Sequence, residues 1–335
     1  MSPDFPDSWI TLHNDAVALA IDRRGGALVS FTFRDLPLNP FDWRMTREEM
    51  PRNNQAGAAY QGHFLCQGRW GPPTDGERQA GIPDNGEPAN REWTVTARPG
   101  PGVLDMEVEA PLERWRIRRT VTLPPGAVSQ VVVEETLINL LPFARFTTWV
   151  QHGTLGGDFL EESTVMDTNA TAGFSQARLA AAATNAECNW PSGQIDSTGR
   201  VVDLRRPLQT TDHVTTHVVD GEWGWATVAT PPRGLLLGYL WKTSEYPWLH
   251  VWNGVKEGRL WARGVEFGTT GLSGRVDAET RATHTFRGRR HFFSVDAHAS
   301  VTRRYVCFLR RITPDFRATL SVGPLDDGGV AVRFE

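Results

Sequence analysis

Short runs of alternating apolar and polar residues, each bounded by Gly, Pro, Asp or Asn, recur along the whole 335-residue chain. Helical periodicity is nearly absent, and repeated β-segments at this spacing are typical of a large antiparallel sandwich or barrel. We therefore predict an all-β fold, a large antiparallel β-sandwich, built as one domain over residues 1–335. The main strand segments are 9–22, 27–33, 92–97, 103–110, 114–123, 129–140, 224–229, 234–241 and 303–312.

Two short segments and one long one depart from this pattern. Residues 174–186 and 46–50 are the local candidates for helices. Residues 54–91 are rich in Gly, Pro and Asn and are too long for a simple hairpin connection. Long structureless loops in compact domains are usually functional or disordered. Because this one carries aromatic and ionisable side chains, we expect a functional loop.

Composition and charge exclude several classes of function. The net charge is −4 and no basic run is interleaved with aromatic residues, so nucleic acid is not an expected partner. No apolar run is long enough to span a membrane, and the opening MSPDFPDSWI lacks the pattern of a secretion signal. We therefore expect a cytoplasmic protein. The sequence does not indicate an oligomeric state.

Cysteine and histidine spacing gives no indication of a metal site. The three cysteines lie far apart without a CxxC motif, so we expect reduced thiols and no disulfide. His213 and His217 form an i,i+4 pair in DHVTTHVV, a segment that reads as a strand. On a strand these two residues share a face but lie about 13 Å apart. We predict no bound metal and no cofactor.

The stretch 259–274, RLWARGVEFGTTGLSG, places one carboxylate in a segment otherwise suited to burial. A buried carboxylate is costly unless it is paired, hydrogen-bonded or used in chemistry. Arg263 is the nearest basic residue, but the two-residue period of a strand puts it on the opposite face from Glu266. The sequence therefore indicates that Glu266 has a chemical role.

Two further segments carry side chains suited to chemistry. In 149–163, WVQHGTLGGDFLEES, His152 ends an aromatic strand and enters a Gly-rich turn. In 69–93 a polar loop that begins with Arg69 closes onto a strand. The chain has no GxGxxG after a strand, no GxxxxGK[ST], no HExxH and no GxSxG.

Taken together and in order, these segments resemble the aldose 1-epimerase (galactose mutarotase-like) family. In that family an Asn-Arg loop leads to a Leu-His-Gly-Gly element before a Trp strand, followed by a Gln/Thr-His strand end, an Asp-His pair and a strand with the catalytic glutamate. The opening NDAVALAIDRRGGALVSFTFRD and the closing FRGRRHFFSVDAHASVTRRYVCFL are also similar to the family's first hairpin and last strands. The matching positions here are Gly68-Arg69, Asn85 in PDNGEP, Gln151-His152, Asp212-His213 and Glu266 in GVEFGTTG.

The resemblance implies the galactose mutarotase-like supersandwich fold and a small-molecule sugar as partner, with no cofactor. It implies that Glu266 is the base at the anomeric hydroxyl and His152 the acid at the ring oxygen, a pair that opens the ring so that the other anomer can form. Residues expected to bind the sugar or line its cleft are Arg69, Asp212, Asn85, His63, Trp70, Trp252 and Trp261.

Two positions depart from the family pattern and keep other functions open. Asn85 stands where the family has its first histidine, and an amide cannot transfer a proton near neutral pH. Gly68 replaces the Asn of the Asn-Arg pair. One alternative is a carbohydrate-binding protein without catalysis. Another is a lyase or isomerase of a uronate-type sugar, in which Arg69 binds the carboxylate. The sequence does not indicate which sugar is recognised or whether it is free, phosphorylated or oxidised.

Overall fold

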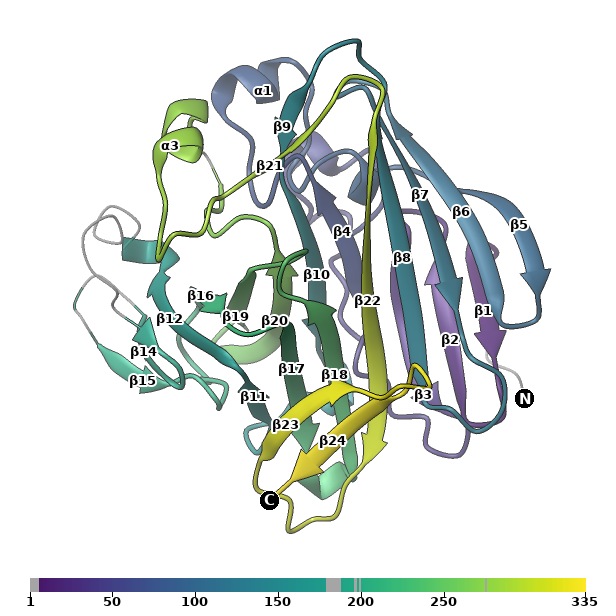
Figure 1. Cartoon of the computed structure of the whole chain (residues 1–335). Helices are drawn as coiled ribbons and strands as arrows, with labels where there is room; N and C mark the ends of the chain where they lie inside the picture. Colours follow the sequence, from purple (N-terminus) through teal and green to yellow (C-terminus); the bar gives the residue numbers. More distant parts are fainter. Residues whose placement is uncertain (1–5, 179–187, 196–197, 199, 275) are drawn as a thin grey trace.

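Two large antiparallel sheets face each other in the computed structural model (Figure 1). The structure describes residues 6–178, 188–195, 198, 200–274 and 276–335. Within these ranges the larger sheet has 12 strands and the smaller has 8. The predicted all-β sandwich is thus confirmed.

The strands of the 12-stranded sheet lie in the spatial order β1 (Trp9–His13), β2 (Val17–Asp22), β3 (Ala27–Phe33), β4 (His63–Gln67), β10 (Trp149–Leu155), β20 (Arg259–Gly268), β19 (Trp248–Lys256), β16 (His213–Val219), β12 (Ala170–Ser175), β13 (Cys188–Asn189), β14 (Ser192–Gln194) and β15 (Val201–Asp203).

The strands of the 8-stranded sheet follow the order β11 (Val165–Thr168), β17 (Trp223–Thr230), β18 (Leu235–Lys242), β22 (Ser300–Arg311), β8 (Gln130–Asn139), β7 (Trp115–Thr122), β6 (Val103–Ala110) and β5 (Thr94–Gly100). Two small pairs are β9 (Arg145–Thr147) with β21 (Phe293–Val295) and β23 (Thr319–Pro324) with β24 (Val330–Phe334). Among the described residues, the short α-helices are α1 (Asp75–Gln79) and α3 (Ala278–Thr283), and the 3₁₀ turns are Arg52–Asn54, Pro88–Asn90, Gly157–Phe159, Gln176–Arg178 and Pro231–Arg233.

The main hydrophobic core lies between the facing sides of the two sheets. Alternate residues of the strands enter it, as the two-residue period predicts: Leu249 and Val251 of β19 and Val265 and Phe267 of β20 are fully buried there. Residues of the other parity, such as His250 and Glu266, therefore face the far side of the 12-stranded sheet.

That far side, here called the outer face, is covered by the chain segments that connect β3 to β4 and β4 to β5. The cover and the sheet form a second buried cluster that includes Trp43, Tyr60, Phe64, Cys66 and Trp70. Aromatic side chains therefore cover the part of the outer face that carries the ionisable residues His250 and Glu266.

Residues 54–91 are more ordered than the sequence suggested. They contain the central strand β4, the helix α1 with a Thr74–Glu77 capping box, and a 3₁₀ turn, so the prediction of one long structureless loop was wrong. Residues 46–50 form turns instead of a helix. Of the second predicted helix, 174–186, residues 174–175 end β12 and 176–178 form a 3₁₀ turn, while 179–186 lie outside the described residues.

Within the described ranges, the helices are all too short or too polar to cross a membrane. The three cysteines are free thiols, and all are buried.

Candidate functional site

A row of five side chains crosses the middle of the outer face, one from each of five neighbouring strands. The strand register places them side by side in the order Phe64 (β4), His152 (β10), Glu266 (β20), His250 (β19) and Thr216 (β16). Antiparallel register brings residues directly opposite each other to within about 5 Å between Cβ atoms. Glu266 therefore lies between two histidines.

Glu266 is the centre of this row. Its side chain is almost fully buried, at 1% exposure. The indole N–H of Trp70 donates a hydrogen bond of 2.6 Å to Oε2, and Nε2 of His152 lies 3.4 Å from the same oxygen. Arg263 points to the opposite face, where its guanidinium donates to the carbonyl of Leu204, as the strand period predicted.

Burial shifts the protonation of both partners toward the neutral form. Desolvation raises the pKa of Glu266 to about 8, although the Trp70 hydrogen bond partly offsets this rise. Desolvation lowers the pKa of His152 to about 3. Between about pH 3 and pH 8 the pair therefore holds one proton, and in this buried site the proton is preferentially on Glu266.

The imidazole of His152 is held in a fixed orientation. Its Nδ1 lies 2.9 Å from the hydroxyl of Thr154, two residues along β10 on the same face. The ring of Phe64 stacks on it at 4.4 Å, and Trp252 approaches it edge-on at 6.2 Å. These contacts direct Nε2 toward Glu266, which is the geometry that a proton exchange between the two side chains needs.

His250 belongs to the row although it was not among the predicted site residues. Its ring stacks on Trp70 at 3.9 Å, and its Nδ1 lies 3.0 Å from the hydroxyl of Thr216. Its Nε2 is buried without a hydrogen-bond partner in the part of the chain that the structure describes. The signal was present in WLHVWNG, because a strand that turns Trp252 to the site also turns His250 there.

Two of the predicted wall residues, Trp252 and Trp261, lie together beside the His152 end of the row. Trp43 from the cover packs against both, at ring distances of 5.9 and 5.2 Å. Trp252 contacts His152 of the pair directly, and Trp261 packs against Trp252. Trp70, the third predicted wall residue, covers the other end of the row.

His63 and Arg69, which were predicted to bind the sugar, do not lie beside the pair. His63 pairs in register with Gly153 and faces the interior between the sheets, where it lies 3.1 Å from both Gln151 and Tyr239. Arg69 follows Gly68, which has a positive φ of 76°, and it forms an ion pair with Glu77.

Asn85 and Asp212 hold loops in place and do not contact the pair. The side-chain oxygen of Asn85 accepts a 2.7 Å hydrogen bond from the backbone of Gly71, so it fixes the segment that carries Trp70. Asp212 is exposed and accepts from the backbone of Val255. It lies four residues before Thr216, the member of the row on β16, or about 13 Å along the strand.

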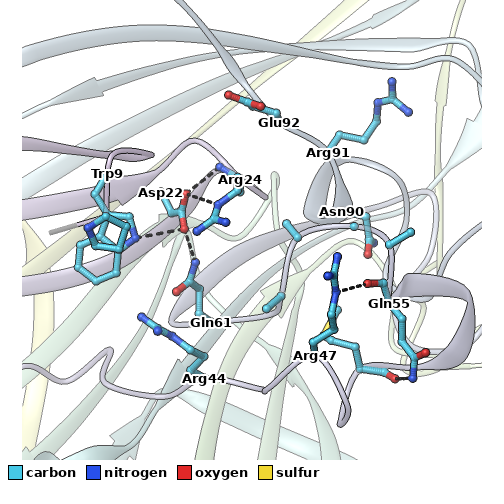
Figure 2. A pocket seen from close by; sticks show the side chains of 16 residues that line it. Trp9, Asp22, Arg24, Arg44, Arg47, Gln55, Gln61, Asn90, Arg91 and Glu92 are labelled. Atoms are coloured by element: carbon cyan, nitrogen blue, oxygen red, sulfur yellow. Dashed lines mark hydrogen bonds and ion pairs between the residues drawn. The ribbon is translucent and has the colours of Figure 1, made fainter.

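A separate cavity of about 490 Å³ opens near the edge of the outer face (Figure 2). At its wall the buried carboxylate of Asp22 accepts hydrogen bonds from Trp9, Gln61 and the backbone N–H of Arg24. These contacts satisfy the carboxylate. The strands β3, β4 and β10 separate Asp22 on β2 from Glu266 on β20, so this cavity is not part of the row.

No group of three or more His, Cys, Asp or Glu side chains that could hold a metal ion occurs among the described residues.

Comparison with known proteins identifies the fold. No protein-family model matches the sequence, and no curated protein does so either. Solved structures do match over nearly the whole chain. A galactose mutarotase related enzyme from Lactobacillus acidophilus matches with a TM-score of 0.60 at 10% identity, covering 91% of this chain and 98% of its own.

Two further structures give the same result. A galactose mutarotase-like protein from Lactobacillus casei matches with a TM-score of 0.60 at 13% identity, covering 90% of this chain and 100% of its own. An aldose epimerase homologue from C. elegans matches with a TM-score of 0.57 at 12% identity, covering 91% and 99%. The chain therefore has the galactose mutarotase-like fold, which confirms the resemblance at the level of the fold.

Proposed function

Starting from this fold, we propose that the protein interconverts the α and β anomers of an aldose, with Glu266 and His152 as the proton-transferring pair. The observation that carries the proposal is the position of the Glu266 carboxyl group, 3.4 Å from the imidazole of His152 and hydrogen-bonded by Trp70 on the buried outer face. A buried ionisable group costs stability, which favours a functional reason for its presence, and here the two groups needed for ring opening face each other.

The pair holds the one proton that mutarotation requires. Ring opening removes a proton from the anomeric hydroxyl and adds one to the ring oxygen, and ring closure reverses both transfers. With the proton on His152, Glu266 takes the hydroxyl proton and His152 gives its own to the ring oxygen. With the proton on Glu266 and the sugar bound so that its ring oxygen faces Glu266, Glu266 gives its proton to the ring oxygen and His152 takes the hydroxyl proton. Either state balances the protons, and the pKa values favour the second state in the closed site.

Substrate entry requires a change at Trp70, because this side chain occupies the carboxylate oxygen that faces His152. The Trp70 segment is held by short contacts: its carbonyl accepts from the backbone of Gly274 at 2.8 Å, and Asn85 holds Gly71. We include in the proposal that a sugar hydroxyl replaces the indole N–H on Glu266 when substrate binds.

Polarimetry tests the proposal. Fresh α-anomers of a panel of neutral aldoses are followed by optical rotation with wild type, Glu266→Gln and His152→Asn, and with Glu48→Gln as a control that removes an exposed carboxylate. The proposal expects wild type and the control to accelerate relaxation of at least one aldose. It expects each pair variant to lose the acceleration by roughly 10²-fold or more, the usual effect of a general acid or base. Equal rates for wild type and both pair variants would refute it.

A second candidate is a carbohydrate-binding protein without turnover. It is favoured by the closed state of the site, in which His152 and Glu266 are 9% and 1% exposed, and by Asn85 acting as a loop support. It predicts sugar binding that survives Glu266→Gln, with no aldose relaxing faster than in buffer. The structure gives no support to a uronate lyase or isomerase, since Arg69 is held by Glu77 away from the pair.

A further inference from the structure

A cavity of about 590 Å³ lies at the end of the sandwich where α1, α3 and β9 come together (Figure 1). Its walls include Arg69, Glu113, Arg145, Thr148 and Arg281. Trp70, which donates to Glu266, is not among the lining residues, and neither are His152 and Glu266. The cavity is therefore separate from the row on the outer face. Its volume is in the range of small-molecule sites.

Four residues that line this cavity each carry a buried side-chain atom with no hydrogen-bond partner within the described ranges: Arg69 Nε, Thr148 Oγ1, Arg281 Nη1 and Glu113 Oε2. The side chains of Arg69 and Thr148 are 7% and 2% exposed. Most buried polar groups in folded proteins are paired, so four unpaired atoms at one cavity need an explanation. A ligand with matching groups provides one.

The unpaired atoms specify what the ligand must carry. Two are guanidinium N–H groups, which require an acceptor and prefer a carboxylate or phosphate oxygen. One is a carboxyl oxygen, which accepts from a hydroxyl. The threonine hydroxyl can do either. The ligand therefore needs an anionic group and hydroxyl groups on one small frame.

The charges around the cavity are poorly compensated by protein groups. Burial and the like charge of Arg69 lower the pKa of Arg281 to about 10, and burial raises the pKa of Glu113 to about 7 despite the nearby Arg69. No carboxylate of the described residues lies within ion-pair distance of Arg281 or Arg145. An anion bound between Arg69 and Arg281 would offset the cost of burying both guanidinium groups.

The rim of the cavity has an aromatic surface. Phe146 is 67% exposed, and its ring lies 4.5 Å from that of Phe292. Inside the rim, the guanidinium of Arg145 stacks on Trp115 at 3.7 Å and donates to the backbone carbonyls of Glu113 and Arg114. An exposed aromatic face beside fixed polar groups is suited to the apolar face of a sugar ring.

We propose that this cavity binds a sugar acid, a monosaccharide-sized hydroxylated ring with a single carboxylate. The carboxylate lies between Arg69 and Arg281, a hydroxyl donates to Glu113, and the ring packs on Phe146. The proposal concerns binding and does not depend on catalysis by Glu266.

The other charged groups decide between a carboxylate and a phosphate. Glu77, Glu113 and Asp277 also line the cavity and would repel a phosphate dianion more strongly than a carboxylate monoanion. A neutral sugar would leave the guanidinium of Arg281 without a charged acceptor, since of the two only Arg69 is paired among the described residues, with Glu77. Charge-assisted hydrogen bonds are about twice as strong as neutral ones.

Isothermal titration calorimetry of the full chain tests the proposal with glucuronate, galacturonate, glucose and glucose 6-phosphate as probes. The variants are Arg281→Gln, Phe146→Ala and Glu266→Gln, and Arg287→Gln is a control that removes an exposed arginine from the turn after α3. Phe146 is exposed, so its replacement leaves the fold intact and keeps the test valid if Arg281→Gln fails to fold.

At least one of the two uronates should bind wild type, Glu266→Gln and Arg287→Gln equally. We expect its affinity to fall roughly tenfold or more in Arg281→Gln and roughly fivefold in Phe146→Ala. Neither uronate binding wild type at concentrations up to about 10 mM would overturn the proposal. So would equal binding of glucose, tighter binding of glucose 6-phosphate, or binding that is lost in Glu266→Gln and kept in Arg281→Gln.

Discussion

Replacing Glu266 with glutamine should make the folded protein more stable at neutral and alkaline pH. Burial raises the pKa of Glu266 from 4.5 to about 8, so the folded state binds this proton more tightly than the unfolded state does. The stability that the proton contributes is fully present below pH 4.5 and is lost as the pH rises to about 8. Glutamine is neutral in both states and avoids this loss.

The size of the effect follows from the shift. One pKa unit corresponds to about 1.4 kcal/mol, so the difference between Glu266→Gln and wild type should be small near pH 4.5 and should grow by about that amount per pH unit. It should reach roughly 3 kcal/mol at pH 7 and level off near roughly 5 kcal/mol above pH 8. The Trp70 N–H can still donate to the amide oxygen of glutamine, so this hydrogen bond is kept.

Urea unfolding followed by tryptophan fluorescence across this pH range measures the difference. Glu48→Gln, which removes an exposed carboxylate, should stay within about 0.5 kcal/mol of wild type at every pH. If Glu266→Gln were instead less stable than wild type at pH 7, with a difference independent of pH, Glu266 would be ionised in the folded protein and paired with a protonated His152. That result would refute the neutral pair.

Substitutions at three further positions test the surroundings of the Glu266–His152 pair. Trp70→Phe removes the N–H that lowers the pKa of Glu266, so the pH at which the stability difference levels off should move upward in the same urea series. His63→Leu leaves Gln151 without its imidazole partner in the interior and should cost about 2 kcal/mol in urea unfolding, with an unchanged rate of anomer interconversion by polarimetry. Asp22→Ala removes the acceptor of Gln61 at the cavity of Figure 2 and should lower stability by about 2 kcal/mol in thermal unfolding, while Asp22→Asn should lower it less.

The sequence predicted the positions of most long strands and, for strands with regular alternation, which residues face the core. Alternation predicted β6, β7, β8 and β18 nearly to their ends, because one side of each strand enters the core. The same period separated Glu266 from Arg263. Applied to WLHVWNG, it would also have placed His250 on the same face as Trp252.

Other features could not be obtained from the pattern. The strand HFLCQ is buried on both faces and has no alternation, so β4 was hidden within a polar segment. Gly68 adopts a positive φ and interrupts the period just before Arg69 and Trp70, which is why the sequence could not tell which of the two faces Glu266. Asn85 has a φ of 60°, and its side chain bonds the backbone of Gly71, so its role in holding the loop depends on a turn that the sequence pattern does not indicate.

One missed feature was present in the sequence. The capping box at Thr74 appears as T-x-x-E, a pattern that marks the start of α1.

The central claim is that the Glu266–His152 pair transfers one proton in each direction, and the pH dependence of anomer interconversion tests it most directly. The pair holds one proton between the pKa of His152 at about 3 and that of Glu266 at about 8. For an aldose that relaxes faster with the protein, we predict a protein-dependent rate that is level near neutral pH and falls tenfold per unit above about pH 8, where the pair has lost its proton. A rate that keeps rising above that pH, or one that Glu266→Gln retains in full, would contradict the claim.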